Sequence, residues 1–372
     1  MIVELFDSYG YDSKGGNFIC NAVRKGLKYE PETRVSRKRN ALCTFLMESG
    51  QETNDINQSP LLYKSKIESD EPIPKHDYSK DYLTFEALED GTFQFSQNAL
   101  QYSVDGGETW DTLAANTATP TITAGSKILW KQTGLTPNAT YPYGIGAFSA
   151  TGNFEVSGNI MSLYYGDNFI GKTDLMGKNS AFNSLFYNCN KLVNAENLIL
   201  SATTLAERCY SGMFSGCSSL TTAPELCATT LANSCYESMF FYCTSLTTAP
   251  ELPATTLAQT CYMQMFYRCT SLTNAPELPA TTLAQNCYHS MFSGCLSLDY
   301  LKILYTGNVN PGEMETVSSE GDLYLYSLSL ASNDDFLRGF NGWRLYVNDA
   351  YSGIIDIQGG GCGCGGGCGC GC

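Results

Sequence analysis

The chain has 372 residues, of which 43% are hydrophobic and 12% aromatic, and its formal net charge is -15. This composition excludes a disordered chain, and no stretch approaches the roughly 20 apolar residues of a membrane-spanning helix. The acidic balance argues against nucleic acid or anionic membranes as partners, because both would be repelled. We therefore expect a folded multidomain protein with no nucleic-acid partner and no membrane span.

Residues 1–78 show no regular periodicity and are predicted to be an irregular anchoring region. Between Lys14 and Arg39 there are eight Lys or Arg residues against two Glu, although the rest of the chain is acidic. The basic segment is either a solvated loop or an arm that docks on an acidic partner. The first residues, MIVELFDSYGYDSKGG, carry acids where an export signal needs basic and then apolar residues, so we expect no export signal. The expected anchoring residues are Arg34, Arg37, Lys38 and Arg39.

Residues 79–170 contain short alternating segments, such as YLTFEAL, KILWKQ and NFEVSG, separated by Gly, Asn and Pro. This pattern predicts a small antiparallel β-sandwich. Within it, SVDGGETW at 103–110 resembles the Asp-box, S-x-D-x-G-x-T-W, a β-hairpin motif of sialidase propellers and many other β proteins. The resemblance implies that Asp105 and Gly107 set a turn above Trp110, and that the motif is structural.

An internal repeat fills most of residues 171–300, with an irregular leading copy in which Cys189 lies 28 residues before Cys217, followed by regular copies. Each copy contains two cysteines and a phenylalanine between them, and the first cysteines of two successive copies, Cys209 and Cys235, are 26 residues apart. The same interval separates the first cysteines, the second cysteines and the phenylalanines of the later copies, which defines a 26-residue period. In each copy an apolar stripe at i, i+4, i+8 and i+12 predicts a helix, and the Pro-containing segment beside it predicts a strand. The predicted fold class is therefore a β-rich multidomain protein, in which an antiparallel β-sandwich is followed by an α/β leucine-rich-repeat solenoid of strand–turn–helix units.

The repeat cysteines are predicted to be buried, compact apolar residues. Two residues eight apart on a helix lie about 12 Å apart along its axis, whereas a disulfide needs Cα atoms within about 7 Å. His76 and His289 are the only two histidines, and neither accompanies the cysteines at a metal-ligand spacing. We also find no nucleophilic triad motif and no phosphate-binding loop, so we expect neither a cofactor nor enzymatic activity.

The C-terminal segments are predicted to cap and extend the repeats. Residues 301–358 contain YLKILYTG, DLYLYSL and WRLYVND, which are typical of capping strands. Residues 359–372 form a Gly/Cys-rich tail that cannot bury a core. The tail is a disordered reactive terminus, a site of inter-chain disulfides or anchoring, or a ligand for a soft metal. Its cysteines are Cys362, Cys364, Cys368, Cys370 and Cys372.

The repeat consensus, LTTAPELPATTLAxxCYxxMFxxCTSL, resembles the leucine-rich repeats of the BspA-like group. Such repeats occur on surface proteins of gut and oral anaerobic bacteria and in phages that infect them. The resemblance implies a non-enzymatic solenoid used for adhesion or recognition. Because we expect no export signal, we predict a phage appendage, such as a head or tail fibre, that is assembled in the host cytoplasm.

This hypothesis sets the expected location and partners. The protein would lie on the virion surface as a homo-oligomer, bind a host cell-surface protein or glycan, and dock on virion or cell-envelope proteins through its N-terminal region. The alternatives are a bacterial cell-surface, extracellular adhesin and an intracellular protein-interaction scaffold.

One face of the predicted sheet is a candidate ligand-binding surface. Alternation places Thr221, Ala223 and Glu225 opposite the buried leucines, and the repeat period stacks the equivalent residues beside them. Carboxylates in such a column repel one another. They are either a solvated column screened by salt or a lining for a recognition surface, on which the small alanines leave room for a partner. The candidate residues are Thr221, Glu225, Thr247, Glu251, Thr273 and Glu277.

Overall fold

The computed structural model describes residues 9–10, 19–20, 76–132, 148–309, 311–313 and 317–357. The chain divides into two compact units, Met1–His76 and Asp77–Cys372. In the first unit, β1 (Tyr9–Gly10) and β2 (Ile19–Cys20) pair antiparallel. Two sets of predicted residues lie outside the described residues: the anchoring residues Arg34, Arg37, Lys38 and Arg39, and the five tail cysteines.

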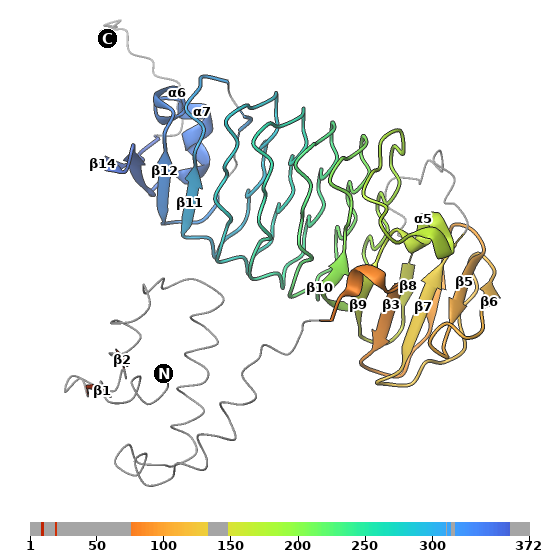
Figure 1. Ribbon diagram of the computed structural model, residues 1–372. Coiled ribbons are helices and arrows are strands. Elements are labelled where there is room, and N and C mark those ends of the chain that lie inside the picture. The colour runs from red at the N-terminus through yellow and green to blue at the C-terminus, as the bar shows by residue number, and fades with distance from the viewer. Residues whose placement is uncertain are drawn as a thin grey trace, which may run out of the picture. The chain divides into compact units, whose positions relative to one another are not determined.

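The second unit begins with a β-rich part that contains two sheets (Figure 1). The larger sheet has the strand order β10-β9-β3-β7-β5-β6. Its neighbours are antiparallel except β9 and β10, which run parallel. The smaller sheet is the antiparallel pair β4 and β8. The elements of this part are η2 (Tyr78–Lys80), β3 (Leu83–Ala87), β4 (Phe93–Phe95), β5 (Leu100–Ser103), β6 (Asp111–Leu113), β7 (Lys127–Lys131), β8 (Phe148–Ala150), β9 (Phe154–Asn159), α5 (Ser162–Tyr165), η3 (Gly166–Asn168) and β10 (Leu192–Ile199).

Aromatic side chains fill the space between these two sheets. Alternation along the strands buries every second residue, as in β4 and β7. The ring of Phe85 in β3 lies 5.3 Å from that of Phe93 in β4 and 4.9 Å from that of Phe148 in β8, between centroids. The predicted antiparallel β-sandwich is therefore wrong in detail, because one large mixed sheet packs on a two-stranded one.

The Asp-box segment forms the expected turn between β5 and β6. Ser103 Oγ donates to Asp105 Oδ1 at 2.6 Å, and the Thr109 N–H donates to the same carboxylate at 3.0 Å. These hydrogen bonds hold the pKa of Asp105 well below its usual range, and the bond from Ser103 has the largest effect. Trp110 Nε1 donates to the Gly107 carbonyl at 3.1 Å, and its ring lies 5.0 Å from that of Tyr82. The motif thus closes a hairpin and packs it on the sheet.

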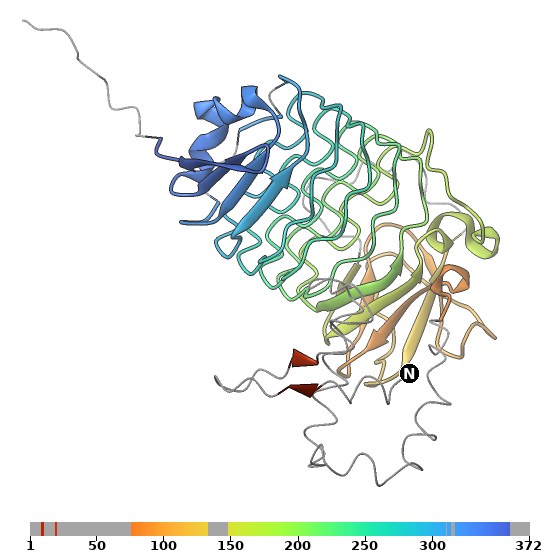
Figure 2. The same ribbon diagram turned by 60° about the vertical axis from the view of Figure 1, so that its left-hand side comes forward.

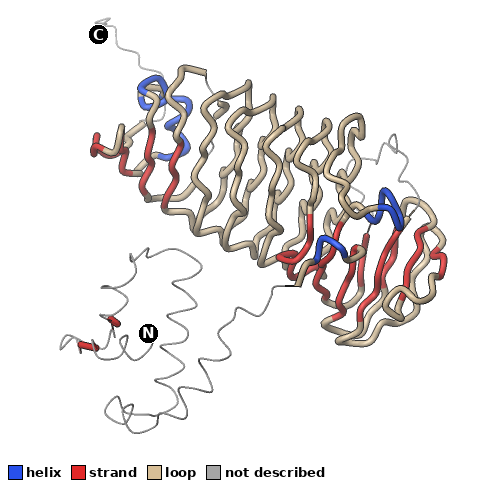
Figure 3. Tube along the Cα trace, viewed as in Figure 1, coloured by secondary structure: helices blue, strands red, loops and turns tan. Residues whose placement is uncertain are grey.

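The repeat copies are not strand–turn–helix units, so the predicted α/β solenoid is wrong. Within residues 171–299, all of which are described, there is no helix, and β10 is the only named strand. Figure 3 shows the copies almost entirely as loops and turns. Neighbouring copies are instead joined by single-residue parallel bridges, such as Thr222 with Thr248 and Thr248 with Asn274. Figure 2 shows the copies as successive passes of the chain that lie side by side.

Each predicted helix is instead a series of tight turns. The N–H groups of Cys235, Glu237 and Met239 donate to the carbonyl three residues earlier, whereas an α-helix bonds four residues back. The N–H groups between them donate to the next copy. Tyr236, for example, donates to the carbonyl of Cys261 at 3.0 Å. Half of the backbone donors thus close turns, and the other half bind consecutive copies together.

A left-handed residue at every fourth position stops helix formation. In one copy Ser234, Ser238 and Tyr242 have φ of 54°, 56° and 59°, in a region that non-glycine residues seldom occupy. A series of four-residue turns and a helix with 3.6 residues per turn bury the same side chains over a length of three turns. The apolar stripe alone could therefore not distinguish the two structures.

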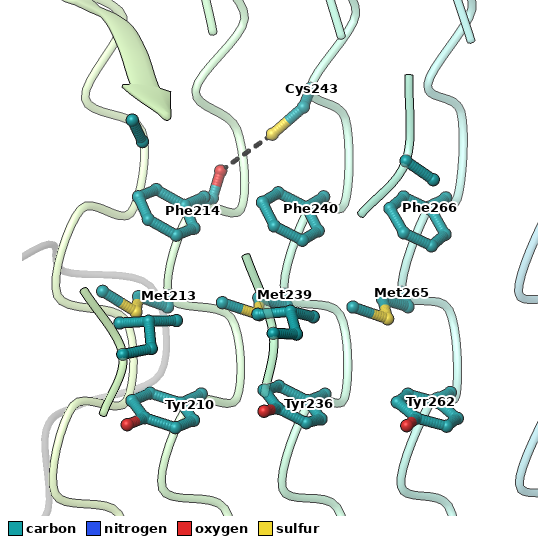
Figure 4. Packing of buried hydrophobic residues seen from close by; sticks show 14 of the residues in the cluster. Tyr210, Met213, Phe214, Tyr236, Met239, Phe240, Cys243, Tyr262, Met265 and Phe266 are labelled. Carbon is teal, nitrogen blue, oxygen red and sulfur yellow. Dashed lines mark hydrogen bonds between the residues drawn. The ribbon is translucent and has the colours of Figure 1, made fainter. Parts of the chain in front are cut away.

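Equivalent side chains of successive copies stack in columns inside the repeat region (Figure 4). The ring of Phe240 lies 5.4 Å from that of Phe214 and 5.5 Å from that of Phe266, with interplanar angles of 1° and 2°. The phenylalanine column continues through Phe186 to Phe148, 5.7 Å further on, in the β-rich part. The two parts of the second unit therefore share one core.

The repeat cysteines are buried free thiols, as predicted. Cys243 has no exposed surface, and its Sγ donates to the Phe214 carbonyl of the preceding copy at 3.1 Å. Cys217, Cys269 and Cys295 make the equivalent bond. Burial raises the pKa of the Cys243 thiol well above its usual range. These thiols act as packing residues that also bind one copy to the next.

The last part of the second unit is a four-stranded sheet of order β11-β12-β13-β14 with short helices beside it. The first three strands are parallel and β14 is antiparallel to β13. A bridge from Leu278 to Ile303 joins this sheet to the copy before it. Its elements are β11 (Tyr300–Ile303), β12 (Asp322–Leu325), α6 (Leu328–Ala331), α7 (Asp334–Leu337), η4 (Arg338–Phe340), β13 (Arg344–Val347) and β14 (Ala350–Ile354).

Candidate functional site

The six residues of the predicted ligand-binding surface are all exposed and are held in register by the bridges between copies. Thr222 pairs with Thr248, and Thr248 pairs with Asn274, so the residues next to them also lie beside their equivalents in the neighbouring copies. The glutamates at 225, 251 and 277 precede the buried leucines at 226, 252 and 278. They therefore form the exposed row expected from the repeat period.

The threonines in this surface take part in holding the copies together. Thr221 Oγ1 donates to the Val193 carbonyl at 3.0 Å, and Thr273 Oγ1 donates to the Thr247 carbonyl at 3.2 Å. Their backbone N–H groups donate to the same carbonyls. A hydroxyl that already bonds the preceding copy is less available to a ligand. The glutamates, rather than the threonines, remain as candidates for contact with a partner.

The alanines do not leave room for a partner, contrary to the prediction. Ala249 is only 7% exposed, and Ala223 and Ala275 pack against the core, whereas Thr248 and Asn274 are exposed. Strict alternation requires a regular strand, and here the chain pairs through isolated bridges. The inward and outward positions therefore depart from a period of two.

The acidic row ends on a lysine of the C-terminal sheet. Lys302 of β11 follows Glu277 in the parallel register, and its Nζ lies 3.2 Å from Glu277 Oε1. This contact is the first cause of a raised pKa at Lys302. The Lys302 side chain is 23% exposed and that of Glu277 is 54% exposed. The charge of the row thus changes sign at the boundary between the copies and the sheet.

Beyond Lys302 the same row consists of tyrosines. Strand register places Lys302 beside Tyr324 of β12, Tyr324 beside Tyr346 of β13, and Tyr346 beside Tyr351 of β14. The rings of Tyr324 and Tyr346 stack at 4.4 Å with an interplanar angle of 9°. The outermost ring, Tyr351, is 60% exposed. We call the whole row the sheet-face row: Glu225, Glu251, Glu277, Lys302, Tyr324, Tyr346 and Tyr351.

The tyrosines are flanked by an ion pair on one side and by a hydrogen bond on the other. In the adjacent row Arg344 binds Asp322 through two bonds, from Nε to Oδ1 at 2.5 Å and from Nη2 to Oδ2 at 2.9 Å. Tyr326 donates its hydroxyl to Asp349. Bidentate Arg–carboxylate pairs fix geometry as well as charge. The face therefore presents rings in a preset arrangement, which lowers the entropy lost when a partner binds.

The row can stack and hydrogen-bond, and it combines three carboxylates, one ammonium group and three phenols. The tyrosine half of the row was not predicted from the sequence. The available signal was the alternation of tyrosine with leucine in DLYLY and RLYV, where the leucines are buried or partly buried, which places Tyr324 and Tyr346 on the open face. Among the residues that the structure describes, no group of three or more His, Cys, Asp or Glu side chains is placed to hold a metal ion.

Within the described residues, none of the helices of the protein combines the length and the apolar character needed to cross a bilayer. Comparison of the chain with family models, curated proteins and solved structures gave no match. The resemblance to BspA-like repeats therefore rests on the repeat sequence alone.

Proposed function

We propose that this protein is a non-enzymatic recognition protein whose sheet-face row binds a host cell-surface protein or glycan. The observation that carries the proposal is the row of ordered, partly exposed tyrosines beside Lys302. Tyrosine offers a large contact area at a low entropic cost and is enriched at the centre of interfaces.

The acidic half of the row has a supporting role in this proposal. Three carboxylates at repeated positions would attract a partner with hydroxyl or amine donors, and the change of sign at Lys302 would set the partner's register. Such charges mainly change the rate of association and its salt dependence, whereas the stacked rings contribute most to affinity.

The experiment measures adhesion of the labelled protein to intact host cells and to an array of glycans without acidic sugars. Tyr324, Tyr346 and Tyr351 are replaced together by serine, and in a second variant the three glutamates are replaced by glutamine. A matched control carries Glu108→Gln, Glu207→Gln and Glu320→Gln, which remove the same charge from exposed sites elsewhere. We expect loss of adhesion in the tyrosine variant, weaker and less salt-dependent adhesion in the glutamate variant, and no change in the control. Adhesion at the wild-type level in the tyrosine variant, with its fold intact by circular dichroism, would reject the proposal.

The place of display is a further part of the proposal. A virion appendage, with residues 1–78 docking on the particle, agrees with the basic Lys14–Arg39 segment in an acidic chain. Mass spectrometry of purified particles should then detect the protein, and a chain without residues 1–78 should fold but not be incorporated. Incorporation of the truncated chain at wild-type levels would contradict this docking role. A bacterial surface adhesin would instead be found in the cell envelope fraction.

A further inference from the structure

The two middle copies of the repeat differ from their neighbours at one surface corner. The two residues before the second cysteine are Ser-Gly at 215–216 and again at 293–294, but Phe-Tyr at 241–242 and Tyr-Arg at 267–268. Elsewhere in these copies the sequence is nearly the same. Two adjacent copies therefore carry three rings and a guanidinium where the copies on either side carry almost no side chain.

These side chains form one cluster, which we call the aromatic–arginine corner: Phe241, Tyr242, Tyr267 and Arg268. The rings of Phe241 and Tyr267 stack at 5.0 Å with an interplanar angle of 9°. Arg268 Cζ lies 5.4 Å from the centroid of Tyr242 and 5.5 Å from that of Tyr267. Arg268 Nη1 donates to Tyr242 Oη at 2.7 Å. Tyr242 is 36% exposed, and Arg268 is also exposed.

Folding alone does not account for the residues at this corner. Tyr242 and Arg268 have φ of 59° and 57°, and the equivalent residues in the flanking copies are Gly216 and Gly294, which adopt positive φ freely. A Cβ added to Gly294 would lie 2.7 Å from Arg268 Cγ, so this glycine leaves the space beside the arginine side chain. Positive φ recurs throughout the copies, so the contrast at this corner lies in the side chains, which are absent at the flanking glycines and large here.

The Arg268 guanidinium has donors left for an anion. None of the ion pairs within the described residues includes it. A guanidinium has five N–H donors, more than two tyrosine hydroxyls can accept. Stacking on aromatic rings leaves its planar edge suited to bidentate binding of a carboxylate.

We propose that the aromatic–arginine corner binds the terminal sugar of a glycan when that sugar carries a single carboxylate. Arg268 would bind the carboxylate, while the rings of Tyr242 and Tyr267 would contact the apolar C–H face of the sugar. The net charge of -15 disfavours a polyanionic partner, because repulsion acts on every charge of the polymer. A single carboxylate experiences this repulsion only once, and its short-range attraction to Arg268 offsets the repulsion. This site is separate in sequence from the sheet-face row.

The test measures binding of the full chain to immobilised glycans that end in sialic or glucuronic acid, and to the same glycans with the carboxylate converted to its methyl ester. We expect binding to the acid and at least a tenfold loss with the ester. Arg268→Gln should cause the same loss. Arg208→Gln is the matched control, because Arg208 is also exposed, precedes a repeat cysteine, and has φ of 55°.

A second variant tests the rings without disturbing the fold. Tyr242→Gly gives this copy the residue found at 216 and 294, so the thermal midpoint should be maintained while binding falls at least tenfold. Equal binding of acid and ester, or unchanged binding by Arg268→Gln, would overturn the proposal, as would preference for an acidic peptide or a sulfated polymer. The variant with the three glutamates of the sheet-face row replaced should bind these glycans normally, which separates this test from that of the proposed function.

Discussion

The stacked phenylalanine column allows the contribution of contacts between copies to be measured. Phe240 is fully buried and has ring neighbours on both sides, at 5.4 and 5.5 Å. Phe292 is equally buried, but the only ring that stacks on it among the described residues is Phe266, at 5.5 Å. The two residues therefore differ in the number of stacked rings and not in burial.

Replacing each phenylalanine by leucine keeps an apolar side chain and removes the stacking. An aromatic pair contributes about 0.5–1.5 kcal/mol beyond its buried area. Phe240→Leu should therefore lower the free energy of unfolding by about 1–3 kcal/mol from stacking, and Phe292→Leu by about half as much. The smaller volume of leucine adds a similar cost to both.

Equilibrium urea unfolding, followed by circular dichroism, measures both variants against the wild-type protein. Equal slopes against urea concentration would show that both variants unfold over the same cooperative unit. Our reasoning would be refuted if Phe292→Leu lowered the free energy of unfolding as much as Phe240→Leu, because the ring neighbours would then contribute nothing measurable.

Cys243→Ala should cost about 1–2 kcal/mol through lost packing and leave metal content unchanged in elemental analysis; stoichiometric zinc that disappears in the variant would contradict this. Tyr210 Oη is buried without a partner among the described residues, so Tyr210→Phe should raise the free energy of unfolding by about 1 kcal/mol, and a loss in urea titration would count against it. Burial holds the pKa values of Cys243 and Tyr236 well above 9.0 and 10.0. Both groups stay protonated in the folded state while the unfolded chain loses protons, so stability should be constant below about pH 9 and fall above it; a flat profile in urea titrations across this range would be inconsistent with buried thiols and phenols.

The repeated spacing by itself determined the interior of the copies. Cysteine, tyrosine, methionine and phenylalanine that recur at one fixed interval must occupy equivalent places, and Cys243, Tyr236 and Phe240 are indeed buried. The exposure of Glu225 and its equivalents also followed from the sequence. A charged residue beside a buried leucine seldom points inward, because an unpaired buried charge is costly.

The backbone of the copies could not be predicted in the same way. A chain of turns and a helix bury the same side chains over three turns, and the difference lies in the positive φ of residues such as Ser238. No short-range signal marks a serine as left-handed. That conformation is fixed by the bonds to the next copy, such as that from the Ser238 N–H to the Met263 carbonyl at 2.8 Å.

Only the tertiary structure brought the candidate binding groups together. Lys302, Tyr324 and Tyr346 follow one another at a shorter interval than the period of the copies, and they become neighbours through the parallel register of β11, β12 and β13. Burial of Ala249 likewise depends on isolated bridges instead of a regular strand. The spacing of hydrophobic residues specifies which side chains are buried, whereas the pairing of strands from distant segments determines which exposed side chains lie next to one another.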